Sequence, residues 1–134
     1  MKKLLFALCM LLTAATFVAC EDDDETLFER LVGRVWIGDL GMYDQRIPVS
    51  YPLESAIYLG SDGFGSDDLC YYDNGEPFAV FNIQWDAYDG NLYINYGNRA
   101  APRELRNVRV RRGWLTGDLF IDRRFYGEVS LRMQ

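Results

Sequence analysis

Residues 78–96 read FAVFNIQWDAYDGNLYINY. From Phe81 to Trp85, apolar and polar residues alternate with a period of two, which is typical of a strand with one buried and one solvated face. Asp89-Gly90 then provides a strong two-residue hairpin signal, and residues 91–96 resume the apolar alternation. The stretch therefore predicts two antiparallel strands joined by a tight turn.

The same pattern extends to both sides of this hairpin, with turn residues between short apolar runs. Further strands are predicted at residues 34–40, 55–59, 65–72, 105–112, 115–121 and 125–133. No later helical pattern is long enough to cross between parallel strands. Residues 27–134 are thus predicted to form one all-β domain, an antiparallel up-and-down meander of about eight strands that closes into a lipocalin-like barrel, with a two-sheet sandwich as the alternative.

A short helix is predicted before the first strand. Apolar residues at positions 27, 28, 31 and 32 share one helical face, and Gly33 ends the pattern. We expect this helix to pack Phe28 and Leu31 against the β-domain.

The composition excludes several classes of function. The chain has 134 residues, a formal net charge of −6 and no histidine. The acidic balance argues against a nucleic-acid partner. The absence of histidine removes Ser-His-Asp triads, Cys-His dyads and histidine metal sites.

Residues 1–19 have the layout of a secretory signal peptide. Lys2 and Lys3 form a charged start, an apolar run follows from Leu4 to Leu12, and small residues close the segment. The apolar run is shorter than the roughly 20 residues that a membrane-spanning helix needs. Removal of residues 1–19 would also remove both lysines, which excludes lysine-based covalent and phosphate-binding chemistry in the mature chain.

The segment Phe17-Val18-Ala19-Cys20 resembles the lipobox of bacterial lipoproteins, in which the cysteine is lipidated before the preceding peptide is removed. Phe17 departs from the leucine that is usual at its position. The resemblance implies that Cys20 is the first mature residue and carries two or three acyl chains such as palmitate, which anchor a protein stably where one chain holds only marginally. An ordinary signal peptide that ends at Cys20 is the alternative.

An acidic block, Glu21–Glu25, follows Cys20. Like charges repel one another and stay solvated, so residues 20–26 are predicted to form an extended tether. The block also resembles the export signal of surface lipoproteins of Bacteroidota, which implies a lipid-anchored location on the cell surface. A spacer without a sorting role, which leaves the domain on the periplasmic face, is the alternative.

A further resemblance to a known family rests on three segments of the β-domain, residues 31–38, 62–65 and 85–92. Together they resemble small lipocalin-like lipoproteins of Bacteroidota over most of residues 27–133. The resemblance implies a β-barrel fold on an outer-membrane anchor. It implies neither a ligand nor an activity.

The aromatic residues are candidates for a ligand site. Trp36, Trp85 and Trp114, together with nine tyrosines, are available to line a cavity that stacks on sugar rings or holds a small apolar ligand. The alternative is that they fill the barrel core. Trp114 points to the opposite face of its strand from Leu115, and it is predicted to face outward or to lie at a rim.

Charge is segregated along the chain. Residues 53–98 contain eight acids and no arginine, whereas residues 99–124 contain eight arginines and three acids. In a meander this predicts an acidic and a basic side, with Arg106, Arg109 and Arg111 as candidates for contact with a protein or an anionic glycan. The alternative is a solvated surface with cross-strand ion pairs of modest effect.

No catalytic residue, metal site or cofactor is predicted. Asp67 and Asp68 are the obvious carboxylate pair, but adjacent residues of a strand point to opposite faces and cannot share a substrate. The predicted function is non-catalytic binding of a small apolar or glycan ligand by a barrel held to the membrane through Cys20. A structural or adhesion module, and a hydrolase with dispersed carboxylates, are the alternatives.

Overall fold

The computed structural model describes residues 27–45 and 50–134, so the predicted signal peptide, Cys20 and the acidic tether lie outside the described residues. Eight strands form one closed antiparallel barrel, in which each strand pairs with its neighbours in sequence and β1 pairs with β8. The strands are β1 Val35–Asp44, β2 Tyr51–Leu59, β3 Phe64–Tyr71, β4 Pro77–Tyr88, β5 Asn91–Asn95, β6 Arg103–Arg111, β7 Trp114–Ile121 and β8 Arg124–Met133. The predicted up-and-down barrel is confirmed, and the sandwich is not the fold.

The hairpin of β4 and β5 forms as its sequence pattern predicts. Ile83 and Trp85 face the interior at 3% and 5% exposure, while the intervening Gln84 is exposed. Asp89 and Gly90 have φ values of 54° and 75°. Both central residues of a type I′ turn need positive φ, so this dipeptide fixes the register of the hairpin.

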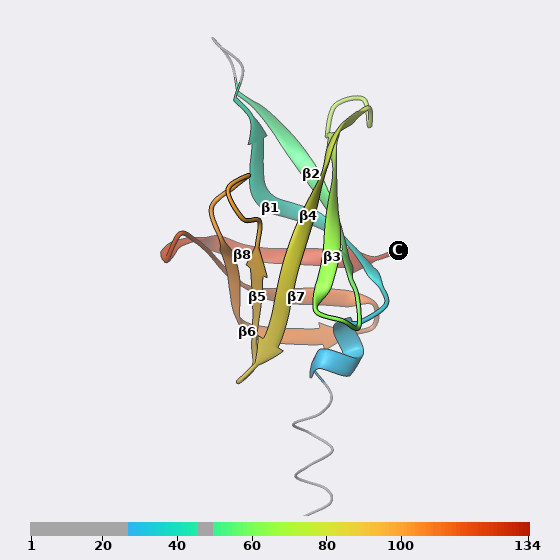
Figure 1. Cartoon of the computed structure of the whole chain (residues 1–134), viewed down its shortest axis with the longest axis vertical. Helices are drawn as coiled ribbons and strands as arrows, with labels where there is room; N and C mark the ends of the chain where they lie inside the picture. The colour runs from blue at the N-terminus through green and yellow to red at the C-terminus, as the bar shows by residue number, and fades with distance from the viewer. Residues whose placement is uncertain (1–26, 46–49) are drawn as a thin grey trace, which may run out of the picture.

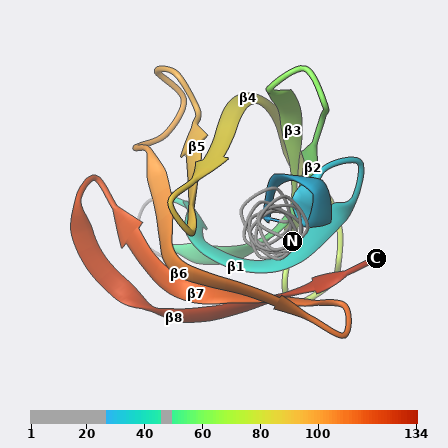
Figure 2. The same cartoon turned by 90° about the horizontal axis from the view of Figure 1, so that it is seen from below.

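The barrel consists of two differently oriented groups of strands that share β1 (Figures 1 and 2). Strands β2 to β4 stand along the long axis, whereas β6 to β8 run across it (Figure 1). β1 bends between the groups, where its register with β2 shifts between Gly38 and Met42. Its pairing with β8 is confined to Trp36 and Ile37. After Ile37, the edge of β1 that faces β8 therefore needs other hydrogen-bond partners for its backbone groups.

A short helix over residues 27–31 covers one end of the barrel, here called the closed end (Figure 2). The Phe28 ring stacks on Trp85 with a centroid distance of 4.6 Å, and Leu31 is fully buried. The indole of Trp36 donates a 3.2 Å hydrogen bond to the Leu31 carbonyl. These contacts confirm the predicted docking of Phe28 and Leu31. Within the described part of the chain, no helix combines the length and apolar character needed to cross a membrane.

The opposite end, here called the mouth, is surrounded by residues 72–76, 96–102 and 122–123. Because successive strands alternate in direction, the last residues of β1, β3 and β7 and the first residues of β2, β4 and β6 meet there. The core is mainly leucine, isoleucine and tryptophan. Four polar residues are also buried, namely Asp44, Ser55, Asp67 and Arg103. Burial of such groups is costly unless they are hydrogen-bonded.

Candidate functional site

A cavity of about 450 Å³ opens at the mouth of the barrel. Its apolar lining comes from Met42, Leu53, Leu69, Phe78, Phe81 and Ile121. Arg99 and Arg103 add two guanidinium groups to this lining. The volume falls within the range of about 300–1,000 Å³ that is usual for small-ligand pockets, and an apolar wall with a few polar groups is their usual chemistry.

The guanidinium of Arg103 is held in place by backbone carbonyls. Its Nε donates to the Leu40 carbonyl at 3.0 Å, and its Nη2 donates to the Gly41 carbonyl at 2.9 Å. Nη1 donates to the Ala101 carbonyl at 2.7 Å. Leu40 and Gly41 lie in the bend of β1, where the register with β2 is interrupted. Arg103 therefore supplies the hydrogen bonds that the sheet does not provide there.

Among the described residues, no carboxylate forms an ion pair with Arg103, although the charges of Asp67 and Asp39 act on it from a greater distance. The side chain is 6% exposed. The guanidinium lies 5.6 Å from the ring centroid of Tyr96. Burial lowers the pKa of Arg103, but an arginine remains protonated in proteins. A buried positive charge thus adjoins the mouth cavity.

Asp67 forms a polar cluster with Ser55 and Tyr96 in the interior. Its Oδ2 accepts a 2.7 Å hydrogen bond from the Tyr96 hydroxyl and a 3.0 Å hydrogen bond from Ser55 Oγ. Asp67 is fully buried, and its Oδ1 has no hydrogen-bond partner among the described residues. Burial raises the pKa of the Asp67 carboxyl above its ordinary 3.8, and the hydrogen bonds from Tyr96 and Ser55 oppose this rise.

Aromatic contacts connect the rim of the mouth to this cluster. The Arg99 guanidinium lies 5.8 Å from the centroid of the Phe81 ring. Phe81 in turn meets Tyr96 edge to face, at 6.4 Å between centroids and an interplanar angle of 82°. Tyr96 contacts both Asp67 and Arg103. Tyr96 is not itself part of the cavity lining, so Phe81 and Arg103 stand between the mouth cavity and Asp67.

The three tryptophans do not meet in one cavity. Trp36 is fully buried at the closed end, where its indole contacts Leu31. Trp85 lies near the same end, and its Nε1 donates to the Gly60 carbonyl at 2.8 Å. Trp114 is 48% exposed on the outside of β7, in agreement with its predicted outward orientation. None of the three belongs to the lining of the mouth cavity.

The candidate basic residues lie on the outer face of β6. Arg106 pairs with Glu104 at 2.9 Å and covers the Phe120 ring at 3.9 Å from its centroid. Arg109 and Arg111 are exposed and line a groove that also includes Arg30 of the helix. The three arginines therefore lie away from the mouth, and Arg106 is already engaged within its own sheet.

The strand alternation of Asp67 and Asp68 follows the prediction, with Asp67 fully buried and Asp68 exposed. Within residues 27–45 and 50–134, no cluster of histidine, cysteine and acidic residues is arranged to hold a metal ion. Arg103 and Asp67 were not singled out as a site from the sequence. The period of two along a strand places Arg103 on the same face as the core residue Leu105. It places Asp67 on the same face as the core residue Leu69 in the same way.

The chain matches no protein-family model, no curated protein and no solved structure.

Proposed function

We propose that this protein is a non-catalytic lipoprotein of the outer membrane, acylated at Cys20 and displayed on the cell surface. Its barrel binds a small, mainly apolar ligand that carries an acidic group. The lipobox-like segment 17–20 and the acidic block after it support the anchor and the location. The closed barrel agrees with the resemblance to lipocalin-like lipoproteins of Bacteroidota.

The observation that carries the ligand proposal is the position of Arg103 beside the apolar wall of the mouth cavity. Of the five N–H donors of its guanidinium, three hydrogen-bond to carbonyls, which leaves two for a ligand. Asp67 and Asp39 act on the Arg103 charge only from beyond ion-pair distance, and a ligand carboxylate would add a hydrogen-bonded contact with it. Its apolar part would displace water from Phe81, Met42 and the neighbouring side chains.

The position of the helix supports an orientation on the membrane. The helix begins at residue 27 at the closed end, so the chain from Cys20 enters the domain opposite the mouth. A fully extended tether over residues 20–26 would span at most about 25 Å. The closed end would therefore lie near the membrane, and the mouth would face outward, where a ligand can reach it.

A matched set of amphiphiles tests the ligand. The soluble domain, residues 26–134, contains the helix and all eight strands. Decanoate, decanol and decyltrimethylammonium share an apolar chain and differ in the charge of the end group. We expect decanoate to bind about tenfold more tightly than decanol, which corresponds to about 1.4 kcal/mol, and the cation to bind most weakly. Isothermal titration calorimetry measures the three affinities, and equal affinities would contradict the role of Arg103.

Two arginine variants locate the binding site. Arg99→Gln removes the exposed guanidinium at the mouth and should weaken decanoate binding. Arg109→Gln removes an exposed guanidinium from the outer face of β6 and should leave decanoate binding unchanged. An equal loss in both variants would indicate a general charge effect rather than a site at the mouth.

Cell fractionation tests the anchor separately. Cys20→Ser should abolish acylation and move the domain to the soluble fraction. Protease added to intact cells should digest the wild-type domain. Membrane attachment of the Cys20→Ser protein would contradict lipidation, and protection from protease would place the domain on the periplasmic face.

A further inference from the structure

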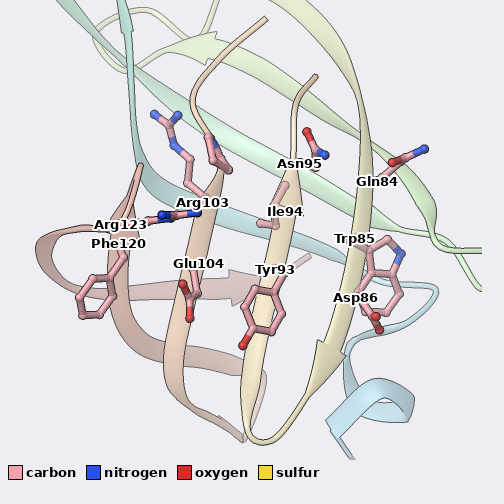
Figure 3. A pocket seen from close by; sticks show the side chains of 11 residues that line it. Gln84, Trp85, Asp86, Tyr93, Ile94, Asn95, Arg103, Glu104, Phe120 and Arg123 are labelled. Carbon is pink, nitrogen blue, oxygen red and sulfur yellow. The ribbon is translucent and has the colours of Figure 1, made fainter. Parts of the chain in front are cut away.

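A groove of about 480 Å³ lies on the outer wall of the barrel over strands β4 to β7 (Figure 3). It is a different groove from the one lined by Arg30, Arg109 and Arg111. The outward side chains Asp86, Tyr93, Glu104 and Phe120 lie in a row across the groove over β4 to β7 (Figure 3). Gln84, Asn95 and Arg123 also contribute to the lining. Arg103 lines both this groove and the mouth cavity, whereas the apolar wall of the mouth is not part of the groove.

The strand register explains the row. Asp86 pairs with Tyr93, Tyr93 pairs with Glu104, and Glu104 pairs with Phe120. Neighbouring strands are about 4.8 Å apart, so Tyr93 and Phe120 stand about 10 Å apart along the sheet. The carboxylate of Glu104 lies between these two aromatic side chains.

Neighbouring side chains hold the row in place before any ligand binds. Tyr88 stacks on Tyr93 at 4.5 Å between centroids and an interplanar angle of 19°. Glu104 Oε1 accepts a 2.9 Å hydrogen bond from Arg106 Nε, and the same guanidinium covers Phe120. Such fixed groups lose little conformational entropy on binding. Oε2 of Glu104 is not used by the hydrogen bond from Arg106 and can accept one from a ligand.

The chemistry of the groove selects against several kinds of ligand. The acidic Asp86 and Glu104 are matched in the lining by Arg103 and Arg123, so the groove has no net positive charge that would favour a polyanion. A peptide cannot add as a strand here, because β4 to β7 are each paired on both sides. Four charged side chains in the lining, Asp86, Glu104, Arg103 and Arg123, would also be unusual for a protein contact, whose core is depleted of charge.

A neutral sugar fits the side chains that line this groove. The C–H face of a sugar ring can cover an aromatic side chain, and its hydroxyls can donate to carboxylates and accept from amides or guanidinium groups. We propose that this outer groove binds a neutral glycan, with sugar rings on Tyr93 and Phe120 and a hydroxyl hydrogen-bonded to Glu104. This inference goes beyond the proposed function and does not depend on it.

Calorimetric titration with neutral hexasaccharides tests the proposal. The probes are maltohexaose, cellohexaose, mannohexaose, xylohexaose and chitohexaose, added to the soluble Cys20→Ser chain of residues 20–134. We expect at least one to bind with a Kd at or below about 1 mM, and a heparin hexasaccharide to bind more weakly. Absence of binding by all five neutral sugars, or a preference for the heparin fragment, would overturn the proposal.

Three variants place the sugar. Tyr93→Ala should weaken binding at least tenfold, and Glu104→Gln, which keeps the shape of the side chain, should weaken it severalfold. Tyr58→Ala removes a tyrosine that is 43% exposed on β2 and should have no effect. An unchanged urea unfolding midpoint shows that a variant remains folded. Equal losses for Tyr93→Ala and Tyr58→Ala would overturn the assignment to the groove.

Discussion

Tyr96 donates a 2.7 Å hydrogen bond to Oδ2 of Asp67 inside the barrel. The two residues are 29 positions apart in sequence. Ser55 of β2 donates to the same oxygen at 3.0 Å. A single carboxylate therefore connects β2, β3 and the segment that follows β5, next to the cavity at the mouth.

Removal of the Tyr96 hydroxyl should destabilise the fold. Tyr96→Phe keeps the ring but takes one of the two side-chain donors from a fully buried carboxylate. We expect the free energy of unfolding at neutral pH to fall by about 1–3 kcal/mol. Urea denaturation measures this loss. Tyr51→Phe, which changes a residue that is 43% exposed, is the control and should change stability by less than about 0.5 kcal/mol.

Asp67→Asn should change how stability depends on pH. Burial raises the folded-state pKa of Asp67 above the ordinary 3.8, so the folded protein favours the protonated carboxyl. The contribution of this group to stability is therefore complete below about pH 3.8 and is lost as pH rises through the raised pKa. Asparagine does not titrate, so the variant should gain stability relative to the wild type as pH rises.

The expected gain is about 1.4 kcal/mol for each pH unit between the two pKa values of Asp67. Chemical denaturation from about pH 3.5 to about pH 8 measures it. A stability difference that is constant across this range would contradict the raised pKa.

Two glycine substitutions should differ in their effect. A Cβ at Gly65 of β3 would collide with the carbonyl oxygen of Tyr58 on β2, which is backbone and cannot move aside easily. Gly65→Ala should therefore cost about 1–3 kcal/mol of unfolding free energy. Gly127→Ala meets no atom within 4 Å and should stay within about 0.5 kcal/mol of the wild type. Thermal unfolding of both variants tests the contrast, and similar melting temperatures would show that β2 and β3 can separate locally.

Loss of the Phe28 ring should weaken the packing of the helix over residues 27–31 against the closed end of the barrel. Phe28 stacks on Trp85 with an interplanar angle of 11°, and Phe28→Ala removes both the stack and the apolar area. We expect the free energy of unfolding to fall by about 2 kcal/mol. We also expect a red shift of tryptophan emission, because Trp85 becomes more exposed to water. Phe64→Ala, at a residue that is 55% exposed, should have little effect on either measurement. Equal losses would mean that the helix contributes no more than a surface contact.

Most of the strands could be predicted from sequence because their signals are local. The β4–β5 hairpin follows from alternation and from Asp89-Gly90, and its observed bounds agree with those signals. The end of β1 could not be found in this way. The strand runs on to Asp44, but the irregularity between Gly38 and Met42 interrupts the period of two that would have indicated its length.

The sequence by itself determined the strand pattern, the opposite faces of Asp67 and Asp68, and the lipobox-like segment that motivates the anchor proposal. These features depend on residues that are close together along the chain. The tertiary structure alone decided what the inward polar residues contact. Arg103 bonds to carbonyls 63 and 62 positions away, and those carbonyls are available only because β1 bends as the barrel closes. Alternation specifies the face on which a side chain lies, whereas closure of the sheet specifies what lies opposite it.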